Sequence, residues 1–461
     1  MPPAGLEARA VEISTLARLS HELFTAPEVG RLLADAEREA RDDDERALLR
    51  ETRHLYERAT RVPQALVARL SAATARALPV WAEARATSDF QRFAPALSEL
   101  VALRREYAEH VDPEADPYEV LFADHEPWIP LAEARRALEA LAARLTPLVP
   151  KAVERTREWS QDLGGPFAAE DQMRACQRVL DLLGYDRTRG RLDVSAHPFS
   201  TGNVHDARIT TRFDPRDPLS AVFSVVHEFG HALYTLGLPA EHFGTPLGDA
   251  RDLVVHESQS RLWENHVARS QAFWECALPT VREALGLRAQ VDAPRVFQAA
   301  NRVRPSFIRV EADELTYHVH IAVRLQVETA LFDADLPVKE VPSVWNEAVA
   351  AGLGMTPPDD ARGCLQDVHW SHGAFGYFPT YSLGSMLAAQ LFDAFSRGHG
   401  GAGAVDDDLR EGRFTPLTQW LRERVHRHGK RQTTPELIRH ATGGTLGPDA
   451  FVAYARRKWG I

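Results

Sequence analysis

The segment from Asp217 to Gly237 constrains the fold most, because it carries the start and stop signals of a single helix. Asp217 suits the N-cap position and Pro218 suits the first helical position. Gly237, followed by Pro239, suits the C-terminal stop. Most positions between these signals are apolar, so we expect a largely buried helix. Any polar side chain on its buried face would need a partner.

Two histidines on this helix, His227 and His231, are four residues apart and therefore project from the same face. Two imidazoles in that arrangement can share one metal ion, and neutral imidazole is a good zinc ligand. Glu228 points to the side, where it can reach a metal-bound water without ligating. The alternative is an amphipathic helix with solvated histidines, which the apolar neighbours disfavour.

A third metal ligand must come from elsewhere, because a catalytic zinc usually has three protein ligands and one open position. No histidine follows within the short spacing of HExxHxxGxxH proteases. Glu257 follows His231 at a distance that leaves space for a loop and for the start of another helix. With Glu257 as the third ligand, the set is that of the gluzincins, two histidines and one glutamate. His256 could ligate instead, and an i,i+4 ion pair with Arg261 is the structural alternative for Glu257.

Apolar side chains recur at helical spacing over most of the chain. Two such stripes are Leu48, Leu55 and Val62, and Leu131, Leu138, Leu141 and Leu145. We expect both stripes to pack in the core, with the intervening Glu and Arg side chains in solvent.

The pattern changes over residues 190–214, where apolar and other residues alternate. Two alternating runs, 192–196 and 209–213, flank the turn-rich segment 200–203, so we expect a β-hairpin there. A Gly-rich, acidic stretch at 397–408 is expected to form a surface loop.

These patterns predict a mainly α protein with a small β-sheet near the metal site. We expect a single domain over residues 1–461. Its expected parts are a helical N-terminal part (1–185), a β-hairpin (186–216) and a helical catalytic part (217–461) that holds the metal.

Composition excludes several other classes of function. The net charge of −11 disfavours nucleic acid and anionic lipid as partners. No apolar run approaches the roughly 18 residues that span a membrane, and the N-terminus does not read as a signal peptide. The 3 cysteines are widely spaced and suit a reducing compartment, so we expect a cytoplasmic protein.

Several motifs occur in a fixed order along the whole chain. They are His197-Pro-Phe199, Asp206-Ala-Arg-Ile-Thr210, His227-Glu-Phe-Gly-His231, His256-Glu-Ser-Gln259, Ile308-Arg-Val-Glu-Ala-Asp313 and Gly363-Cys-Leu-Gln-Asp-Val-His-Trp370. On these motifs the chain resembles the carboxypeptidase Taq family of metallocarboxypeptidases. One departure concerns the start, since family members usually carry a longer segment before the equivalent of residues 1–5.

The resemblance implies an activity and an architecture. It implies release of single amino acids from peptide C-termini, with broad specificity and poor action on C-terminal proline. It implies Zn2+ as the metal, with Co2+ as a substitute, and peptides with a free C-terminus as substrates. It also implies a homodimer with the helical fold of neurolysin and angiotensin-converting enzyme, including a deep active-site cleft.

Amide hydrolysis at such a site needs a general base and an oxyanion donor. We expect Glu228 to move the proton and Tyr381 to be the donor. Tyr381 lies in a polar, aromatic run that begins at His369, and the spacing resembles that of the thimet oligopeptidase group. His369 is expected to assist catalysis, and Tyr377 and His372 are substrate-binding candidates. Aromatic packing is the alternative for both tyrosines.

An exopeptidase that recognises a free carboxylate needs a fixed cation, and the planar guanidinium of arginine suits this task. Arg309 is the first candidate, and the resemblance supports it. A structural ion pair with Glu311 or Asp313 is the alternative. Arg208 is the second candidate, and the hairpin that carries it could offer a strand edge to an extended peptide.

The remaining candidates come from the same motifs. Asp206 and Asp367 are expected to orient ligands or neighbouring side chains. His197 and Gln366 are expected to contact the substrate. Two competing functions stay open, namely an endo-oligopeptidase of the same fold and a non-catalytic peptide-binding protein.

Overall fold

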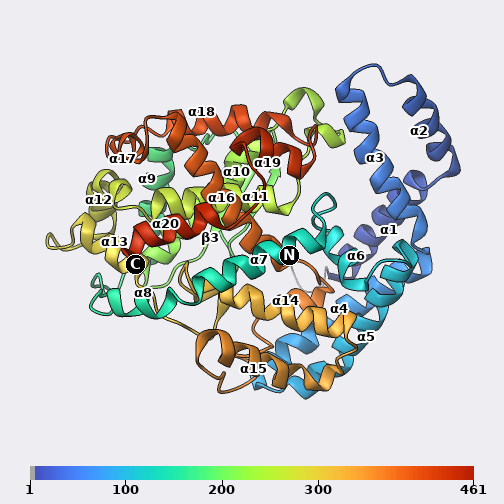
Figure 1. Ribbon diagram of the computed structural model, residues 1–461, viewed down its shortest axis with the longest axis horizontal. Helices are drawn as coiled ribbons and strands as arrows, with labels where there is room; N and C mark the ends of the chain where they lie inside the picture. Colours follow the sequence, from blue (N-terminus) through green and yellow to red (C-terminus); the bar gives the residue numbers. More distant parts are fainter. Residues whose placement is uncertain (1–5) are drawn as a thin grey trace.

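A computed structural model describes residues 6–461 and shows helices around one small sheet (Figure 1). Residues 1–5 lie outside the described residues. The helices before the sheet are α1 (Leu6–Phe24), α2 (Pro27–Glu39), α3 (Asp43–Arg61), α4 (Gln64–Thr87), α5 (Phe90–Val111), α6 (Pro117–Ala123), α7 (Leu131–Leu145), α8 (Val149–Arg155) and α9 (Ala169–Leu183).

The helices after the sheet surround the centre of the molecule. They are α10 (Pro218–Leu236), α11 (Leu253–Arg261), α12 (Gln271–Leu285), α13 (Ala293–Asn301), α14 (Tyr317–Asp333), α15 (Val341–Leu353), α16 (Pro379–Gly398), α17 (Ala402–Arg410), α18 (Thr415–Arg424), α19 (Thr434–Thr442) and α20 (Asp449–Trp459). A π-helical segment, η4 (Leu262–Ala268), continues α11. Short 3-10 turns include η5 (Arg309–Glu311) and η7 (His369–His372). Helix α11 contacts both α10 and α16, and these three helices lie together near the middle of Figure 1.

The sheet has the order β1 (Leu192–Val194), β3 (Asp206–Thr211), β2 (Ser200–Asn203). The segment 200–203, predicted as a turn, is instead strand β2, which pairs antiparallel with β3. Gly202, at φ 139, allows the close approach of the two strands. Strand β1 runs parallel to β3, so the two alternating runs do not form a hairpin with each other. Helix α10 packs against both β2 and β3, so the sheet lies along the helix that carries the two histidines.

The two leucine stripes have different outcomes. Residues Leu131, Leu138, Leu141 and Leu145 are all buried in α7, as predicted. The other stripe is only partly confirmed, because Val62 is buried in the core while Leu55 of α3 is 46% exposed. Helix α3 instead buries Ala47 and Glu51, and Glu51 forms an ion pair with the buried Arg251. A buried carboxylate, rather than a leucine row, therefore joins α3 to the body.

The predicted loop at 397–408 is largely helical. Helix α17 begins at Ala402, and its Val405 and Leu409 are buried one turn apart. This helix contacts α12 and α16, so a short apolar stripe outweighs the glycine content. Only residues 399–401 connect the helices.

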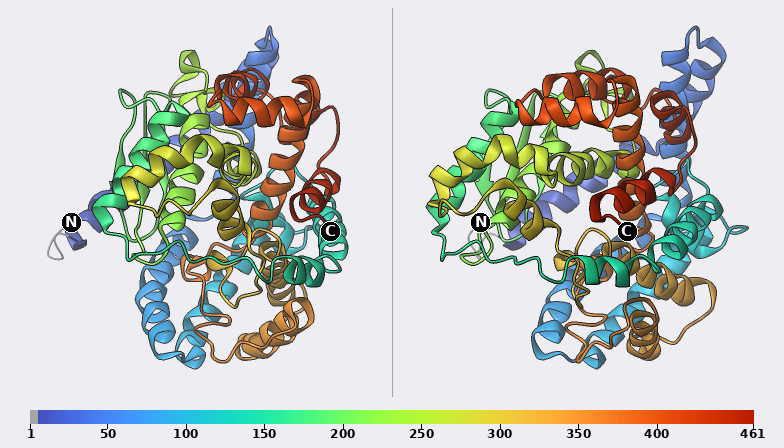
Figure 2. Two further views of the ribbon diagram at one scale, coloured as in Figure 1. Left: turned by 90° about the vertical axis from the view of Figure 1, so that its left-hand side faces the viewer. Right: turned by 60° about the vertical axis from the view of Figure 1, so that its left-hand side comes forward.

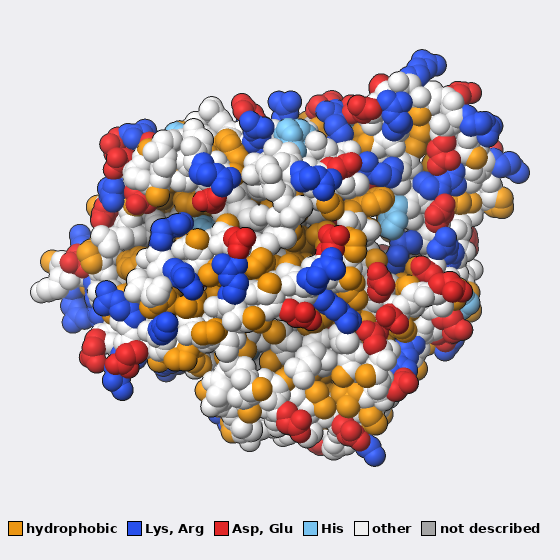
Figure 3. All heavy atoms as spheres, viewed as in Figure 1, with side chains coloured by type: hydrophobic (Ala, Val, Ile, Leu, Met, Phe, Trp, Pro, Cys, Tyr) orange, Lys and Arg blue, Asp and Glu red, His pale blue; other side chains and the backbone are white. Residues whose placement is uncertain are grey.

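On the face shown in Figure 3, basic and acidic side chains are interspersed, and neither charge forms a large patch. Helices α2 and α3 project from the body in both views of Figure 2. None of the described helices is both long and apolar enough to cross a membrane. The cysteines Cys176, Cys276 and Cys364 are all free.

Candidate metal centre and its surroundings

Helix α10 places His227 and His231 as the sequence predicts. The Asp217 side chain accepts a hydrogen bond from the Ser220 amide and caps the helix, and Pro218 occupies its first turn. The two imidazole centroids are 4.9 Å apart. Both rings keep limited solvent access in an otherwise buried helix, at 19% and 14% exposure. The predicted helix and its boundaries are therefore confirmed.

Helix α11 brings Glu257 to the two imidazoles. Its Oε2 atom lies 3.7 Å from His227 Nε2 and 3.5 Å from His231 Nε2. One ligand atom from each of these residues falls within 4.8 Å of the others. Ligands about 2.0–2.1 Å from a tetrahedral centre lie roughly 3.4 Å apart, so this donor set fits a zinc-like dication.

Two glycines let the three central helices approach closely. A Cβ atom on Gly230 of α10 would lie 2.5 Å from the Gln259 carbonyl oxygen of α11. A Cβ atom on Gly384 of α16 would lie 2.8 Å from Cβ of Glu257. Real Cβ atoms do not approach so closely, so these positions require glycine. The spacing of the candidate ligands therefore depends on direct contact between helix backbones.

The outer nitrogen of each candidate ligand has its own partner. His227 Nδ1 lies 2.9 Å from Glu264 Oε2, and His231 Nδ1 lies 2.6 Å from His256 Nδ1. Burial, and then His231, lowers the pKa of His256 to about 3, so His256 is neutral and can accept the His231 proton. Such contacts leave both Nε2 atoms free for a metal. His256, the alternative ligand, thus contacts the ring edge opposite the candidate site.

The ion pair proposed as the structural alternative for Glu257 coexists with its ligand geometry. Arg261 Nε donates to Glu257 Oε1 at 2.7 Å, while the other oxygen, Oε2, faces the imidazoles. Burial opposes ionisation, but Arg261 and the two imidazoles keep the pKa of Glu257 well below its usual range. Glu264 is likewise ionised and is paired with Arg269 at 3.0 Å.

Glu228 follows the first candidate ligand and is only 6% exposed. Burial raises the pKa of Glu228, and the neighbouring His227 and His231 oppose that shift. A carboxyl with a raised pKa is better matched to proton transfer near neutral pH. Its position beside the ligand histidines agrees with the role expected from the sequence.

Tyr381, in the first turn of α16, contacts His369 of η7. The His369 Nε2 atom lies 3.1 Å from the Tyr381 hydroxyl. Burial lowers the pKa of His369 to about 4, and burial also raises the pKa of Tyr381. The tyrosine therefore stays protonated and can donate. Burial, then the charge of Glu257, raises the pKa of Tyr377 to about 12.

Arg309 is buried in a cluster of two guanidinium groups and one carboxylate. Its Nε and Nη2 atoms both donate to Asp367 Oδ1, at 3.0 and 2.8 Å. Arg324 takes the other oxygen, Oδ2, with Nε at 2.7 Å. The partner of Arg309 is therefore Asp367 rather than Glu311 or Asp313. Despite burial, the two arginines hold the pKa of Asp367 far below its usual range.

Gln366 holds the backbone beneath this cluster. Its Oε1 atom accepts the Arg309 amide at 2.8 Å, and its Nε2 atom donates to three backbone carbonyls, including that of Phe307. The Asp313 carboxylate accepts hydrogen bonds from the amides of Leu315 and Thr316, in the turn that precedes α14. Consecutive residues Gln366 and Asp367 therefore fix both the backbone and the side chain of Arg309.

The remaining predicted residues lie outside these contacts. Arg208 is exposed and pairs with Asp206 on the solvent side of β3. Asp206 holds the Arg208 side chain, and among residues 6–461 no hydrogen bond or ion pair joins it to a candidate metal ligand. His197 and His372 are exposed. Asp367 orients arginines rather than metal ligands.

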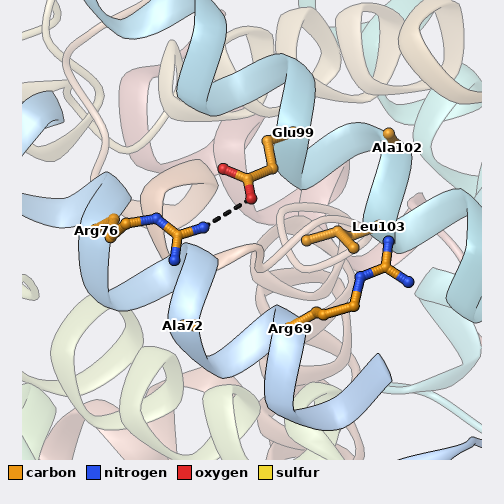
Figure 4. Close-up of a pocket in the computed structure, with 6 residues that line it drawn as sticks. All are labelled: Arg69, Ala72, Arg76, Glu99, Ala102 and Leu103. Atoms are coloured by element: carbon orange, nitrogen blue, oxygen red, sulfur yellow. Dashed lines mark hydrogen bonds and ion pairs between the residues drawn. The ribbon is translucent and has the colours of Figure 1, made fainter. Parts of the chain in front are cut away.

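A surface pocket of about 220 Å³ lies elsewhere, between α4 and α5 (Figure 4). It is lined by Arg69, Ala72, Arg76, Glu99, Ala102 and Leu103. Arg76 and Glu99 neutralise each other across it at 2.7 Å. None of the candidate site residues lines this pocket, so its shape carries no information about the metal centre.

Sequence reasoning missed several residues that complete the site. Glu264 lies seven residues after Glu257, a spacing that places both on one helical face, and this signal could have revealed it. Arg324 and Tyr317 gave no comparable signal, because their partners Asp367 and Arg309 belong to other segments.

The comparisons with known proteins agree with this architecture. Residues 1–459 match the family model described as Carboxypeptidase Taq (M32) metallopeptidase. Thermostable carboxypeptidase 1 of Thermus thermophilus is 39% identical, over 100% of this chain and 92% of its own length. Carboxypeptidase 1 of Bacillus subtilis is 35% identical, over 99% of this chain and 92% of its own.

Solved structures show the same likeness. A Pyrococcus furiosus carboxypeptidase structure superposes with a TM-score of 0.95 at 34% identity, covering 100% of this chain and 93% of that one. Trypanosoma cruzi metallocarboxypeptidase 1 gives a TM-score of 0.95 at 36% identity with the same coverage. The chain belongs to the carboxypeptidase Taq (M32) family of metallopeptidases. It is accordingly a carboxypeptidase, a hydrolase that acts on peptides with a metal cofactor.

Proposed function

We propose that the protein is a zinc carboxypeptidase that releases one amino acid at a time from peptide C-termini. His227, His231 and Glu257 would hold the zinc, since two imidazoles and one carboxylate oxygen are a common catalytic zinc set. When bound, zinc supplies Lewis-acid polarisation of a carbonyl oxygen and lowers the pKa of water. Co2+ could take the same ligands.

Glu228 is proposed as the general base. Its buried carboxyl would accept a proton from the attacking water and return it to the leaving amine. The Glu228→Gln protein should retain zinc and lose hydrolysis. Hydrolysis by a zinc-loaded Glu228→Gln protein at the wild-type rate would rule out this role.

Tyr381 is proposed as the donor to the oxyanion, with His369 accepting or sharing its hydroxyl proton in the resting state. The support is the 3.1 Å contact between the two side chains, together with the close contact of Gly384, one turn further along α16, with Glu257. Tyr377 and His372 would contact substrate from the same run, and His197 from the β1–β2 connection.

The observation that carries the exopeptidase proposal is the charge of the Arg309 cluster. Two buried guanidinium groups share the single carboxylate of Asp367, so one positive charge is unmatched. Arg309 also lies 5.0 Å from the centre of the Tyr381 ring, which connects the cluster to the proposed oxyanion donor. A peptide C-terminal carboxylate would supply the missing negative charge.

The test compares two versions of one N-blocked peptide, with a free acid and with an amide at the C-terminus. Zinc-analysed protein should shorten the free acid one residue at a time, as followed by mass spectrometry, and spare the amide. The Arg309→Ala protein should lose this preference, whereas the Arg208→Ala protein should keep it. Equal cleavage of both peptides, or internal cuts, would favour an endo-oligopeptidase, and no cleavage would favour a binding protein.

Several finer properties belong to the same proposal. Broad specificity, poor action on C-terminal proline, a cytoplasmic location and the deep cleft of neurolysin and angiotensin-converting enzyme follow from the family resemblance. A homodimer is supported by exposed apolar side chains on the N-terminal helices, including Leu16, Leu23 and Leu32. Light scattering of the purified protein tests the oligomeric state.

A further inference from the structure

Tyr317, the first residue of α14, lies between two guanidinium groups that serve different ends of the site. The Arg261 guanidinium carbon is 4.6 Å from the centre of the Tyr317 ring. On the other side, Arg309 Nη1 donates to the Tyr317 hydroxyl at 3.0 Å. The ring is only 6% exposed. One side chain therefore contacts a cation at the metal centre and a cation proposed to bind substrate.

The Arg261 contact ties Tyr317 to the metal ligands. Arg261 donates to Glu257 Oε1 at 2.7 Å and to Glu264 Oε2 at 3.3 Å. Its guanidinium lies against an aromatic ring, a favourable cation–π arrangement. The position of the Tyr317 ring is therefore fixed relative to Glu257 by one intervening side chain.

The Arg309 contact supplies a constraint that Asp367 alone cannot give. Both bonds from Arg309 to Asp367 end on the same oxygen, Oδ1, because Arg324 occupies Oδ2. The Arg309 Nη1 atom has no bond to Asp367, and the Tyr317 hydroxyl is its partner. The guanidinium is therefore held at two separate points, the Asp367 carboxylate and the Tyr317 hydroxyl.

We propose that Tyr317 is a positioning residue that sets the distance and angle between the metal ligands and Arg309. That distance selects how many residues fit between the scissile bond and the C-terminal carboxylate, and the proposed function requires one. The inference rests on the proposed function. It adds the residue that fixes how far the substrate carboxylate lies from the metal ligands.

The experiment uses the zinc-loaded full chain with the Tyr317→Phe substitution, which removes the hydroxyl and keeps the ring. The free-acid and amide peptides serve as substrates, and zinc content is measured on every sample. The matched control is Tyr185→Phe. Tyr185 is also 6% exposed, and its hydroxyl donates to the Ala207 carbonyl of β3 at 2.6 Å.

We expect Tyr317→Phe to raise KM for the free acid about tenfold or more, because a hydrogen bond to a charged group is lost. The value of kcat should change much less, since the contact acts on bound substrate and transition state alike. The preference for acid over amide should fall, and some dipeptide should be released. Zinc content and the Tyr185→Phe kinetics should match the wild type.

A second variant and a binding measurement extend the test. Tyr317→Leu also removes the ring from Arg261, so zinc affinity should fall together with acid preference. In the Glu228→Gln background, calorimetry should show weaker binding of the free acid when Tyr317→Phe is added.

The outcomes separate the two proposals. If the wild type itself shows no acid preference, the proposed function fails and this inference fails with it. If the wild type prefers the acid and Tyr317→Phe keeps the same KM and preference, only the positioning role is overturned. Equal losses on both peptides, or an unfolded Tyr317→Phe protein, would show a merely structural tyrosine and also overturn it.

Discussion

The metal centre and the Arg309 cluster handle buried charge in opposite ways. At the metal centre, Glu257 pairs with Arg261 and Glu264 pairs with Arg269, so each carboxylate has its own guanidinium. In the other cluster, Arg309 and Arg324 share one carboxylate. Glu257 and Glu264 are thus matched by two guanidinium groups before any ligand binds, whereas the Arg309 cluster carries one excess positive charge.

The difference has a physical meaning. Burying an unmatched charge costs free energy unless a partner neutralises it. A carboxylate that is already paired with an arginine stays ionised in the interior and can ligate a metal. Two arginines that share one carboxylate favour the binding of an anionic substrate group. The two regions therefore favour ligands of opposite charge, a cation at the metal centre and an anion at the Arg309 cluster. Tyr317 contacts both regions.

The largest expected effect comes from breaking the metal centre. Glu257→Gln removes a proposed ligand charge and leaves Arg261 without that partner. We expect zinc loss and a fall in kcat/KM of about 1000-fold or more, since a metal contributes several kcal/mol to transition-state stabilisation. Zinc analysis and peptide hydrolysis measure both. A Glu257→Gln protein with full zinc content and activity would remove Glu257 from the ligand set.

The next effect tests the Arg309 cluster. Asp367→Asn would leave two buried guanidinium groups without a carboxylate, which should cost about 3–5 kcal/mol of unfolding free energy. Urea denaturation measures the change. Asp206→Asn is the control, because its exposed pair with Arg208 should leave stability within error. Equal stability of the Asp367→Asn protein would mean that Arg309 and Arg324 do not depend on this carboxylate.

A third prediction concerns pH and the segment that joins the two regions. Glu328 is buried and accepts hydrogen bonds from Tyr118, Trp370 and the Gly376 amide. Burial, which outweighs these donors, raises the pKa of Glu328 to about 7. The native state therefore retains a proton that the unfolded state loses between about pH 4.5 and 7.

The sign follows from that difference in proton binding. Stability from Glu328 is present at low pH and declines as pH rises through this interval, by about 3 kcal/mol. Denaturation at pH 5 and pH 8 should show a steeper decline for the wild type than for Glu328→Gln. Parallel pH profiles would contradict the prediction.

The smallest effect sharpens the geometry of the metal centre. Gly384→Ala would push its Cβ against Glu257 and should cost about 1–3 kcal/mol of stability, with weaker zinc binding. Gly398→Ala is the matched control, because the same helix offers open space there. Zinc titration with a chelator separates the two variants. Equal zinc affinity would show that the helices can move apart without disturbing the ligand.

The two regions also differ in how far the sequence predicts them. His227, His231 and Glu257 lie in helices that follow each other along the chain, and capping signals with i,i+4 spacing are local. The Arg309 cluster joins Arg309, Arg324 and Asp367 from three separate segments, so Asp367 as the partner of Arg309 did not follow from spacing. Helical class and metal motif were predictable, whereas the pairing of distant charges was not.

Local signals also failed where tertiary contacts decide. The segment 200–203 has turn composition but pairs as an edge strand, because Gly202 permits close contact with β3. Leu55 follows a helical stripe but faces solvent, since the buried side of α3 presents Glu51 to Arg251. Arg251 lies 200 residues from Glu51 in the sequence, whereas β3 begins only three residues after the end of β2.

The close helix contacts at Gly230 and Gly384 have a consequence for how the protein melts. Because the proposed ligands depend on backbone contact among α10, α11 and α16, they cannot separate while the central helices stay assembled. Release of the cation and loss of tertiary structure should then occur in one calorimetric transition, and a metal-sensitive dye would report the same midpoint as the heat signal.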